Sequence, residues 1–398
     1  MHRLAWTVCA TFLSAVAQAA DPADVAAARD RITALAGTTA PATGDLSEIV
    51  VPDGSGLTAD DVTLFGRLAG LKKLQILNCR EFDDAMAKSL TGLAGLESLA
   101  ITNSGIGDEG VATLVAAFPD LVELDLSSNT NLTAAAMKSI ASLAKLERLS
   151  LVQTRFNDLN FRRLSKLASL KAVDLRGNME AGDMTLGVLG KLPQLRALKH
   201  RSSVVTDDGI AALAGCGTLD SLLAQDFAIT NESGRHLAAI SGLTSLEVFR
   251  CQGFGTEGVL ALAPLKKLSR LTLRDLPEVG DESLAVLAEL PALKRLALHE
   301  LASVGDAGLG RLAAAKELEV LDIWSLPTMT DATVAVIAGL PQLRELSIRE
   351  TGCTEQALER LASLPKLESL TFKNSAVSAT TAAKLKAAKA WKKLDLGP

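Results

Sequence analysis

Aromatic side chains are scarce in this chain. Tyrosine is absent from its 398 residues, and phenylalanine and tryptophan together make up only 3% of them. The core must therefore be filled by aliphatic side chains, and leucine and alanine dominate the sequence. Such a composition favours a core of repeated aliphatic layers.

A strong excess of charge of either sign is also missing. The formal net charge is -5 at pH 7, and acidic and basic residues are mixed along the whole chain. Nucleic-acid-binding domains concentrate basic residues on one surface, so we expect no nucleic acid partner. After Ala20 no apolar run reaches the roughly 20 residues that a membrane-spanning helix needs, so we expect no transmembrane segment.

Residues suited to catalysis or metal binding are few. After Ala20 the chain contains three histidines, His200, His236 and His299, which lie far apart. Their spacing fits neither a zinc site nor a nucleophile with its base. No HExxH, Walker A or GxSxG motif occurs. We therefore expect no catalytic residues, no metal, no cofactor and no enzymatic activity.

A unit of about 25 residues recurs through most of the chain. Offsets are counted from the opening residue of each repeat. In the copy that opens at Leu268, Leu271 and Leu273 at offsets 3 and 5 predict a short strand. Leu284 and Leu287 predict a helical segment, here called the return, that leads to the next opening residue. A fixed period in this range is the mark of a stacked solenoid. The opening residues are Leu46, Leu71, Leu96, Leu121, Leu146, Leu170, Leu195, Leu219, Leu246, Leu268, Leu293, Leu318, Leu343, Leu367 and Trp391.

The apolar pattern, for example Leu121, Leu124, Leu126 and Asn129, resembles the leucine-rich repeat family over about nine-tenths of the chain. The resemblance implies an α/β fold, a right-handed, horseshoe-like solenoid of about 15 repeats with a parallel concave sheet and convex helices. Turns such as residues 205–210 resemble the cysteine-containing subclass, found in F-box adaptors and in exported bacterial repeat proteins, planctomycete ones especially.

The two ends frame this repeat domain, which we place at residues 45–398. Residues 1–20 have the pattern of a secretory signal, with Arg3, a short apolar run and small residues before Asp21, and we predict cleavage after Ala19 or Ala20. Residues 21–44 are expected to form a capping helix and a linker, with Asp21 as N-cap and Pro22 in the first turn. The protein would then be secreted, or located in the periplasm or cell envelope.

Spacing between the openings is irregular at one place. The step from Leu219 to Leu246 is longer than all the others, and the step from Leu246 to Leu268 is shorter than all the others. We expect either a bulging insertion at residues 225–232 or a bend in the sheet. In the same numbering Cys251 takes offset 5, and the cysteines after Cys9 are interpreted as small buried side chains outside any disulfide.

Acidic residues and glycines recur where the returns begin. We interpret these acids as N-caps of their own helices. Gly253, Gly255 and Gly258 match the dinucleotide-binding pattern GxGxxG, but Gly105, Gly107 and Gly110 repeat that spacing, so the glycines are assigned to turns. The acids are Asp60, Asp108, Asp207, Asp281, Asp306 and Asp331.

Side chains that point away from the core indicate where a ligand would bind. Because side chains alternate along a strand, burial of offsets 3 and 5 places offsets 2, 4 and 6 on the concave face. Offset 6 is cationic, amide-bearing or aromatic in the second half, and includes Gln252, while Arg250 is placed at offset 4. Arginine and tryptophan among acids are typical of recognition hot spots. We predict a ligand-binding centre formed by Arg250, Arg274, His299, Trp324 and Arg349.

The function predicted from the sequence is that of a non-catalytic, exported and monomeric scaffold that binds a protein or an anionic glycan through its concave face. Three alternatives stay open. The repeats could belong to an F-box-like adaptor that presents substrates for ubiquitin transfer. They could belong to a structural element of the cell surface. The charged face could also serve only to keep an exposed sheet soluble.

Overall fold

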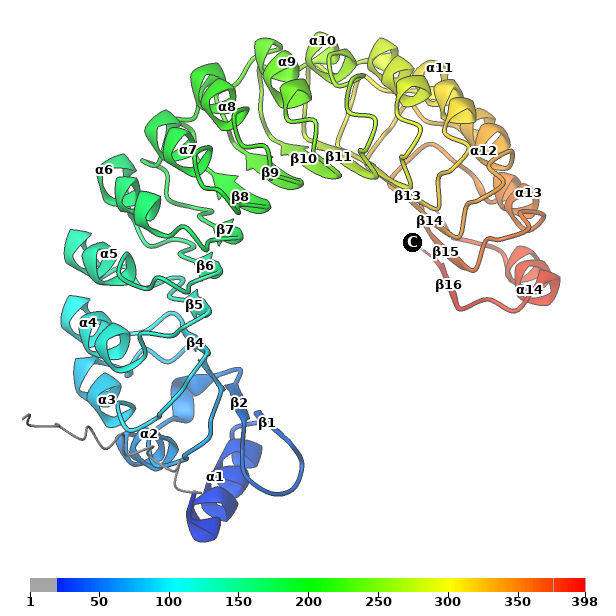
Figure 1. Cartoon of the computed structure of the whole chain (residues 1–398). Helices are drawn as coiled ribbons and strands as arrows, with labels where there is room; N and C mark the ends of the chain where they lie inside the picture. The colour runs from blue at the N-terminus through cyan, green and yellow to red at the C-terminus, as the bar shows by residue number, and fades with distance from the viewer. Residues whose placement is uncertain (1–19, 375, 398) are drawn as a thin grey trace, which may run out of the picture.

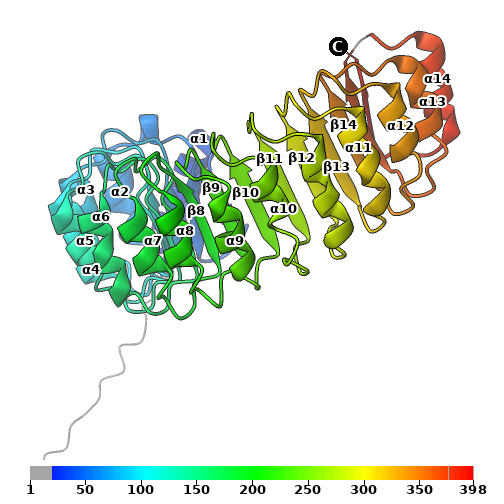
Figure 2. The same cartoon turned by 90° about the horizontal axis from the view of Figure 1, so that it is seen from above.

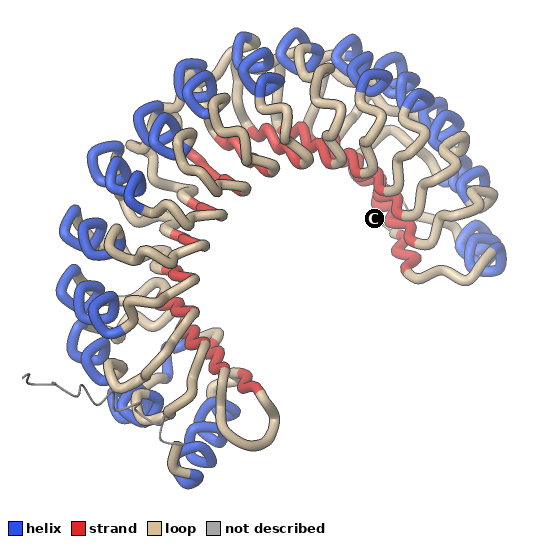
Figure 3. The backbone as a smooth tube through the Cα atoms, viewed as in Figure 1, coloured by secondary structure: helices blue, strands red, loops and turns tan. Residues whose placement is uncertain are grey.

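The chain folds into an open arc of repeated units (Figures 1 and 3). The computed structural model describes residues 20–374 and 376–397. Strands line the inside of the arc and helical returns line the outside. Seen from above, the array also twists along its length (Figure 2). The signal predicted over residues 1–20 lies outside the described residues except for Ala20.

One sheet of 16 strands runs through the described part of the chain, in sequence order from β1 to β16. β1 pairs antiparallel with β2, and every later pair is parallel. The strands are β1 (Thr38–Ala40), β2 (Glu48–Val51), β3 (Lys73–Ile76), β4 (Ser98–Ile101), β5 (Glu123–Asp125), β6 (Arg148–Ser150), β7 (Ala172–Asp174), β8 (Ala197–Arg201), β9 (Ser221–Gln225), β10 (Ser245–Phe249), β11 (Arg270–Arg274), β12 (Arg295–His299), β13 (Val320–Trp324), β14 (Glu345–Arg349), β15 (Ser369–Lys373) and β16 (Lys393–Leu396).

The returns are short helices, because only about half of each repeat is left for them. Several are 3₁₀ rather than α, including the return of the repeat that opens at Leu268. The α-helices are α1 (Pro22–Ala34), α2 (Ala59–Phe65), α3 (Asp84–Ser89), α4 (Asp108–Ala117), α5 (Ala134–Ile140), α6 (Asp158–Phe161), α7 (Asp183–Leu189), α8 (Asp207–Leu213), α9 (Glu232–Ala239), α10 (Thr256–Leu260), α11 (Asp306–Leu309), α12 (Asp331–Ile337), α13 (Leu358–Leu361) and α14 (Ala379–Ala388). The 3₁₀ helices are η1 (Gly54–Gly56), η2 (Arg162–Lys166), η3 (Asp281–Glu289), η4 (Gly310–Ala314) and η5 (Glu355–Ala357).

The core is the aliphatic column that the leucine pattern predicts. Leu271 and Leu273 are buried, and in the next strand Leu296 and Leu298 lie directly beside them. The predicted solenoid, with its parallel concave sheet and helical returns, is confirmed. Residues at the same offset in successive repeats therefore form continuous rows along the array.

The predicted irregularity after Leu219 is wrong. Leu246 pairs with Leu271, which stands at offset 3, so the opening residue of this repeat is Leu243. Both steps then match the rest of the array, and neither an insertion nor a bend is needed. The error arose because leucine occupies both offset 0 and offset 3 of this repeat, so either could be taken as the opening. Cys251 moves from offset 5 to offset 8 and is buried there.

The acids that begin the returns cap the next repeat rather than their own helix. Asp306 is the first residue of α11, yet it accepts hydrogen bonds from Thr330 N (2.9 Å), Thr330 Oγ1 (2.5 Å) and Thr333 Oγ1 (2.5 Å). Burial would raise the pKa of Asp306, but these hydrogen bonds lower it below its ordinary value. Asp60 makes no such bond within the described residues. Equivalent contacts link Asp84 to Gly107, Asp108 to Thr133, Asp158 to Gly182, Asp183 to Thr206, Asp207 to Thr230, Asp281 to Gly305, Asp331 to Thr354 and Glu355 to Ser378.

The GxGxxG pattern belongs to the same ladder of caps. The backbone N–H groups of Gly255 and Gly258 donate to Oδ1 of Asn231, at 2.8 and 2.9 Å. A Cβ atom on Gly258 would lie 2.8 Å from the ring of Phe254, and one on Gly253 would lie 2.7 Å from the carbonyl oxygen of Ile229. Gly253 therefore allows close packing against the preceding repeat, and Gly258 leaves room for the Phe254 ring of its own repeat.

At the N-terminal end, α1 lies against the first layer of the array (Figure 1). Asp21 caps this helix by accepting a hydrogen bond from Ala23 N, and Val25, Ala28 and Ile32 are buried. The segment interpreted as a linker contains β1, which extends the sheet by one antiparallel strand. Among the described residues, no helix is long and apolar enough to span a bilayer.

The cap ladder can be tested in α4, where two neighbouring acids differ in their contacts. Asp108 accepts hydrogen bonds from Thr133 N, Thr133 Oγ1 and Ala136 N of the next repeat, whereas the side chain of Glu109 is exposed. We expect Asp108→Ala to lower the free energy of unfolding by about 1 to 2 kcal/mol, because it leaves these donors without acceptors. The matched variant Glu109→Ala should change it by less than about 0.5 kcal/mol. Urea denaturation measures both; equal losses would contradict the ladder.

Candidate ligand-binding surface

A row of polar and aromatic side chains crosses the concave face in the second half of the array. The sheet register places Phe249 of β10 beside Arg274 of β11, followed by His299 of β12, Trp324 of β13 and Arg349 of β14. Each residue stands at offset 6, the last position of its strand. The strands thus bring together side chains that are far apart in the sequence.

Guanidinium groups contact aromatic rings within this row. The guanidinium carbon of Arg274 lies 4.4 Å from the ring centre of Phe249 and 5.1 Å from that of Trp324. Arg250 contacts the Phe249 ring at 4.7 Å, and Arg349 contacts the Trp324 ring at 5.5 Å. These are cation–π distances. We call Phe249, Arg250, Arg274, His299, Trp324 and Arg349 the cation–aromatic row.

Carboxylates pair with the cationic members of the row. Asp226 accepts hydrogen bonds from Arg201 Nε and Arg250 Nε, each at 2.5 Å. Glu300 accepts one from Arg274 Nε at 2.8 Å. These pairs fix the guanidinium planes, so little side-chain entropy remains to be lost when a ligand binds.

Asp322 is the central acid of the row. Its carboxylate lies 3.1 Å from His299 Nε2 and 3.1 Å from Arg349 Nη2. Partial burial would raise the pKa of Asp322, but hydrogen bonds from His299 and Ser347, helped by nearby positive charge, outweigh it and lower that pKa to about 2. Asp322 is therefore ionised throughout the physiological range. It links three strands, β12, β13 and β14.

The structure corrects two of the positions expected from the sequence. Arg250 is not at offset 4: because Leu243 opens its repeat, Arg250 stands at offset 7, with a left-handed φ of 53°. Gln252 leaves offset 6, and Phe249 takes that place. Arg250 still reaches the row through Phe249 and Asp226. Arg274, His299, Trp324 and Arg349 do stand at offset 6, side by side.

Phe249 is the member of the row that the sequence interpretation missed. The repeat spacing could have revealed it. Taking Leu243 as the opening residue makes the distances to the previous and the next opening residues regular, and it brings Phe249 to offset 6. Phenylalanine is half-buried at this position, whereas Phe227 and Phe254 nearby are buried in the core. An aromatic ring on the concave face of so aromatic-poor a chain is a candidate contact residue.

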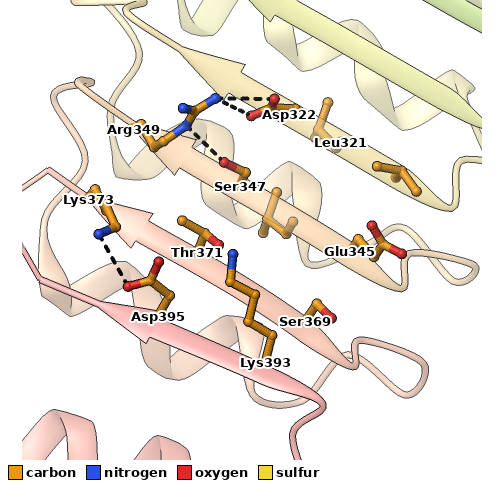
Figure 4. A pocket seen from close by; sticks show the side chains of 12 residues that line it. Leu321, Asp322, Glu345, Ser347, Arg349, Ser369, Thr371, Lys373, Lys393 and Asp395 are labelled. Carbon is orange, nitrogen blue, oxygen red and sulfur yellow. Dashed lines mark hydrogen bonds and ion pairs between the residues drawn. The ribbon is translucent and has the colours of Figure 1, made fainter. Parts of the chain in front are cut away.

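A groove of about 510 Å3 adjoins the row at its C-terminal side, over β13 to β16 (Figure 4). Asp322 and Arg349 belong to both features. Lys373 is paired with Asp395 at 3.3 Å, while Lys393 extends along the groove without an ion pair among the described residues. The groove is lined by Val320, Leu321, Asp322, Glu345, Leu346, Ser347, Arg349, Ser369, Thr371, Lys373, Lys393 and Asp395.

Other groups with catalytic potential are buried beneath the surface. Both ring nitrogens of buried His200 face backbone carbonyl oxygens, of Leu175 (3.2 Å) and Ala181 (2.9 Å). Burial raises the pKa of Cys251 to about 12 and that of Cys353 to about 11, which disfavours the reactive thiolate. Among the described residues, no cluster of three or more His, Cys, Asp or Glu side chains could hold a metal ion.

Comparisons with known proteins identify the repeat class. The Leucine Rich repeat family model matches residues 96–115 and 243–263. No curated protein sequence matches significantly. An internalin (InlF) from Listeria monocytogenes is similar in structure, with a TM-score of 0.55, 19% identity, and 94% of this chain and 95% of that chain covered.

Two further solved structures match with TM-scores below 0.5. Rad7, in its complex with Elc1 in yeast, gives a TM-score of 0.45 at 17% identity and covers 73% of this chain and 83% of that one. TLR13, in complex with ssRNA13, gives 0.49 at 20% identity and covers 79% and 54%. The two family-model matches, the likeness to the internalin and the regular array of strands and returns show that the chain has the leucine-rich repeat fold. At these identities the likenesses concern the fold.

The low pKa of Asp322 predicts how stability depends on pH. Its folded pKa of about 2 lies below the ordinary 3.8, so the unfolded chain binds more protons between these values. The contribution is complete above pH 3.8 and is lost as the pH falls through about 2. We expect Asp322→Asn to lower the free energy of unfolding by about 2 kcal/mol near pH 6, and by less as the pH falls below 3.8. Urea titrations of both proteins from pH 7 to 3 would show the difference shrinking; a constant difference would refute the assignment.

Proposed function

We propose that the protein is an exported, non-catalytic scaffold that binds a protein ligand through its concave face, with the cation–aromatic row at the centre. The supporting observation is Arg274, which is held between Phe249 and Trp324 and paired with Glu300. A guanidinium between two aromatic rings offers polar edges and apolar faces together. Protein interfaces concentrate their binding energy on such arginine and tryptophan anchors.

The charge balance of the row favours a protein over an anionic glycan. Arg250, Arg274 and Arg349 each have an acidic partner, so the surface offers few uncompensated cations. A polyanion would have to compete with those carboxylates for every guanidinium. A protein ligand can instead contact the aromatic rings and supply mixed polar groups around them.

The groove over β13 to β16 extends this surface towards the C-terminal end. It shares Arg349 and Asp322 with the row and adds the hydroxyl groups of Ser347, Ser369 and Thr371. A ligand seated on Trp324 could place a polar segment there. The combined surface would span from β10 to β16, which is long enough for an extended segment or a folded domain.

Binding should depend on the row and not on the N-terminal half of the concave face. With the protein immobilised and exposed to an envelope extract of its source cells, we expect captured proteins to be lost with Trp324→Ala and with Arg349→Ala. Removing a hot-spot side chain costs about 2 kcal/mol, roughly a 30-fold weaker affinity for the captured partner.

Val152→Ala is the matched control, because Val152 stands at the same offset in the repeat of β6, on the concave face but outside the row. It should retain the captured proteins. Retention by all variants would count against the row as the binding centre. Binding to a sulfated glycan column that survives at physiological salt and is lost with Arg349→Ala would favour the glycan alternative.

Export is the second part of the proposal, and it rests on residues 1–20. We expect the protein isolated from its source cells to begin at Ala20 or Asp21, because the small residues Ala17, Ala19 and Ala20 suit a signal peptidase. N-terminal sequencing or intact mass measurement would show this. A chain that retains Met1 would favour the intracellular adaptor alternative instead.

A further inference from the structure

Large hydrophobic side chains are strongly exposed at one place in the described chain. They are Leu159, Met179, Met184 and Val204, with exposed fractions of 60%, 37%, 51% and 48%. All four belong to the repeats of β6, β7 and β8. Scattered exposure would need no explanation, but confinement to three consecutive repeats points to a functional surface.

These side chains form two adjacent rows on the rim of the array, where strands lead into returns. Met179 and Val204 stand at offset 9 of consecutive repeats, and Leu159 and Met184 are the second residues of α6 and α7. A Cβ atom on Gly182 would lie only 3.2 Å from Val204 Cγ2, so Val204 packs against the N-terminal end of α7, the helix that carries Met184. We call Leu159, Met179, Met184 and Val204 the rim patch.

The repeat fold does not require apolar residues at these positions. The second residue of the return is acidic or alanine in most of the other repeats, and the side chains there project into solvent. Leucine and methionine at this position therefore add nothing to stacking between repeats and leave apolar surface in water. The equivalent residues include Glu109, Ala135, Asp208, Glu257, Glu282, Ala307 and Ala332.

Opposite charges flank the rim patch at two opposite corners. Arg155 precedes Met179 in the offset-9 row, and Asp208 follows Met184 in the row of returns. Both side chains are exposed, and neither takes part in an ion pair among the described residues. Glu180, next to Met179, is also exposed and adds a second acidic group to the patch. A surface with a basic group at one corner and an acidic group at the opposite corner can pair with a second copy of itself.

We propose that the rim patch binds the same patch of a second copy of this chain. A two-fold axis that places Arg155 of one copy against Asp208 of the other forms this pair twice and stacks the apolar side chains between them. The sequence alone had suggested a monomer. The contact uses the rim rather than the concave face, so it does not depend on the ligand proposed above.

Sedimentation velocity over a range of protein concentrations tests this proposal. We expect a reversible dimer whose dissociation constant rises at least tenfold with Met184→Glu, because a carboxylate would be buried in the contact. Ala332→Glu is the matched control: it is exposed, it is the second residue of α12, and it should leave the dimer unchanged. A wild-type monomer at all concentrations, or a dimer that Met184→Glu does not weaken, would overturn the proposal.

A charge exchange distinguishes a second copy from any other partner. Arg155→Asp and Asp208→Arg should each weaken the dimer several-fold, and the double variant should restore it because the pair is re-formed with reversed signs. Arg155 has a φ of 63°, a conformation that aspartate tolerates, so the variant should fold. A double variant no tighter than the single ones would exclude the two-fold contact, as would an unrelated protein that binds the patch while this chain stays monomeric.

Discussion

Backbone hydrogen bonds between neighbouring parallel strands set the positions of all other features of this protein. They hold equal offsets of successive repeats about 4.8 Å apart. A side chain at a given offset therefore has fixed neighbours one repeat before and one repeat after. Rows of leucine become the core, and rows of exposed residues become surfaces.

The same register lets polar groups act between repeats. An aspartate at the start of one return meets the unpaired N–H groups at the start of the next, as Asp306 meets Thr330. The concave face is organised in the same way, because Asp322 on β13 pairs with His299 on β12 and Arg349 on β14. Each contact joins two units that would otherwise be linked only by the sheet and the core. Stability thus accumulates from one repeat to the next.

The sequence predicts the fold well because periodicity is a property of many residues at once. A single wrong opening, Leu246 instead of Leu243, left the solenoid assignment intact. It did change the surface, because shifting the opening of one repeat replaced Gln252 with Phe249 in the row. Surface predictions depend on the register of each repeat separately, and leucine at two neighbouring offsets makes that register ambiguous.

Contacts between side chains were harder to predict than positions. The sequence correctly indicates that the acids at the starts of the returns act as caps. It does not show that each acid caps the next repeat rather than its own helix. Asp306 and Thr330 belong to different repeats, and only the stacking distance shows that they meet. The sandwich of Arg274 between Phe249 and Trp324 is similar, since Phe249 had been assigned to another offset and Trp324 is two strands away. Secondary-structure propensity and hydrophobic patterning are properties of a single repeat, whereas these contacts form between two repeats.

The placement of the two proposed surfaces has a consequence for binding strength. The rim patch lies over the repeats of β6 to β8, whereas the cation–aromatic row crosses β10 to β14 on the concave face. A contact at the rim would leave both concave faces of a dimer open. Two linked binding surfaces engage a repetitive or multivalent ligand far more tightly than one, because the second contact forms at a high effective concentration. A scaffold with a modest concave site could therefore hold a repetitive protein ligand firmly while each individual contact stays reversible.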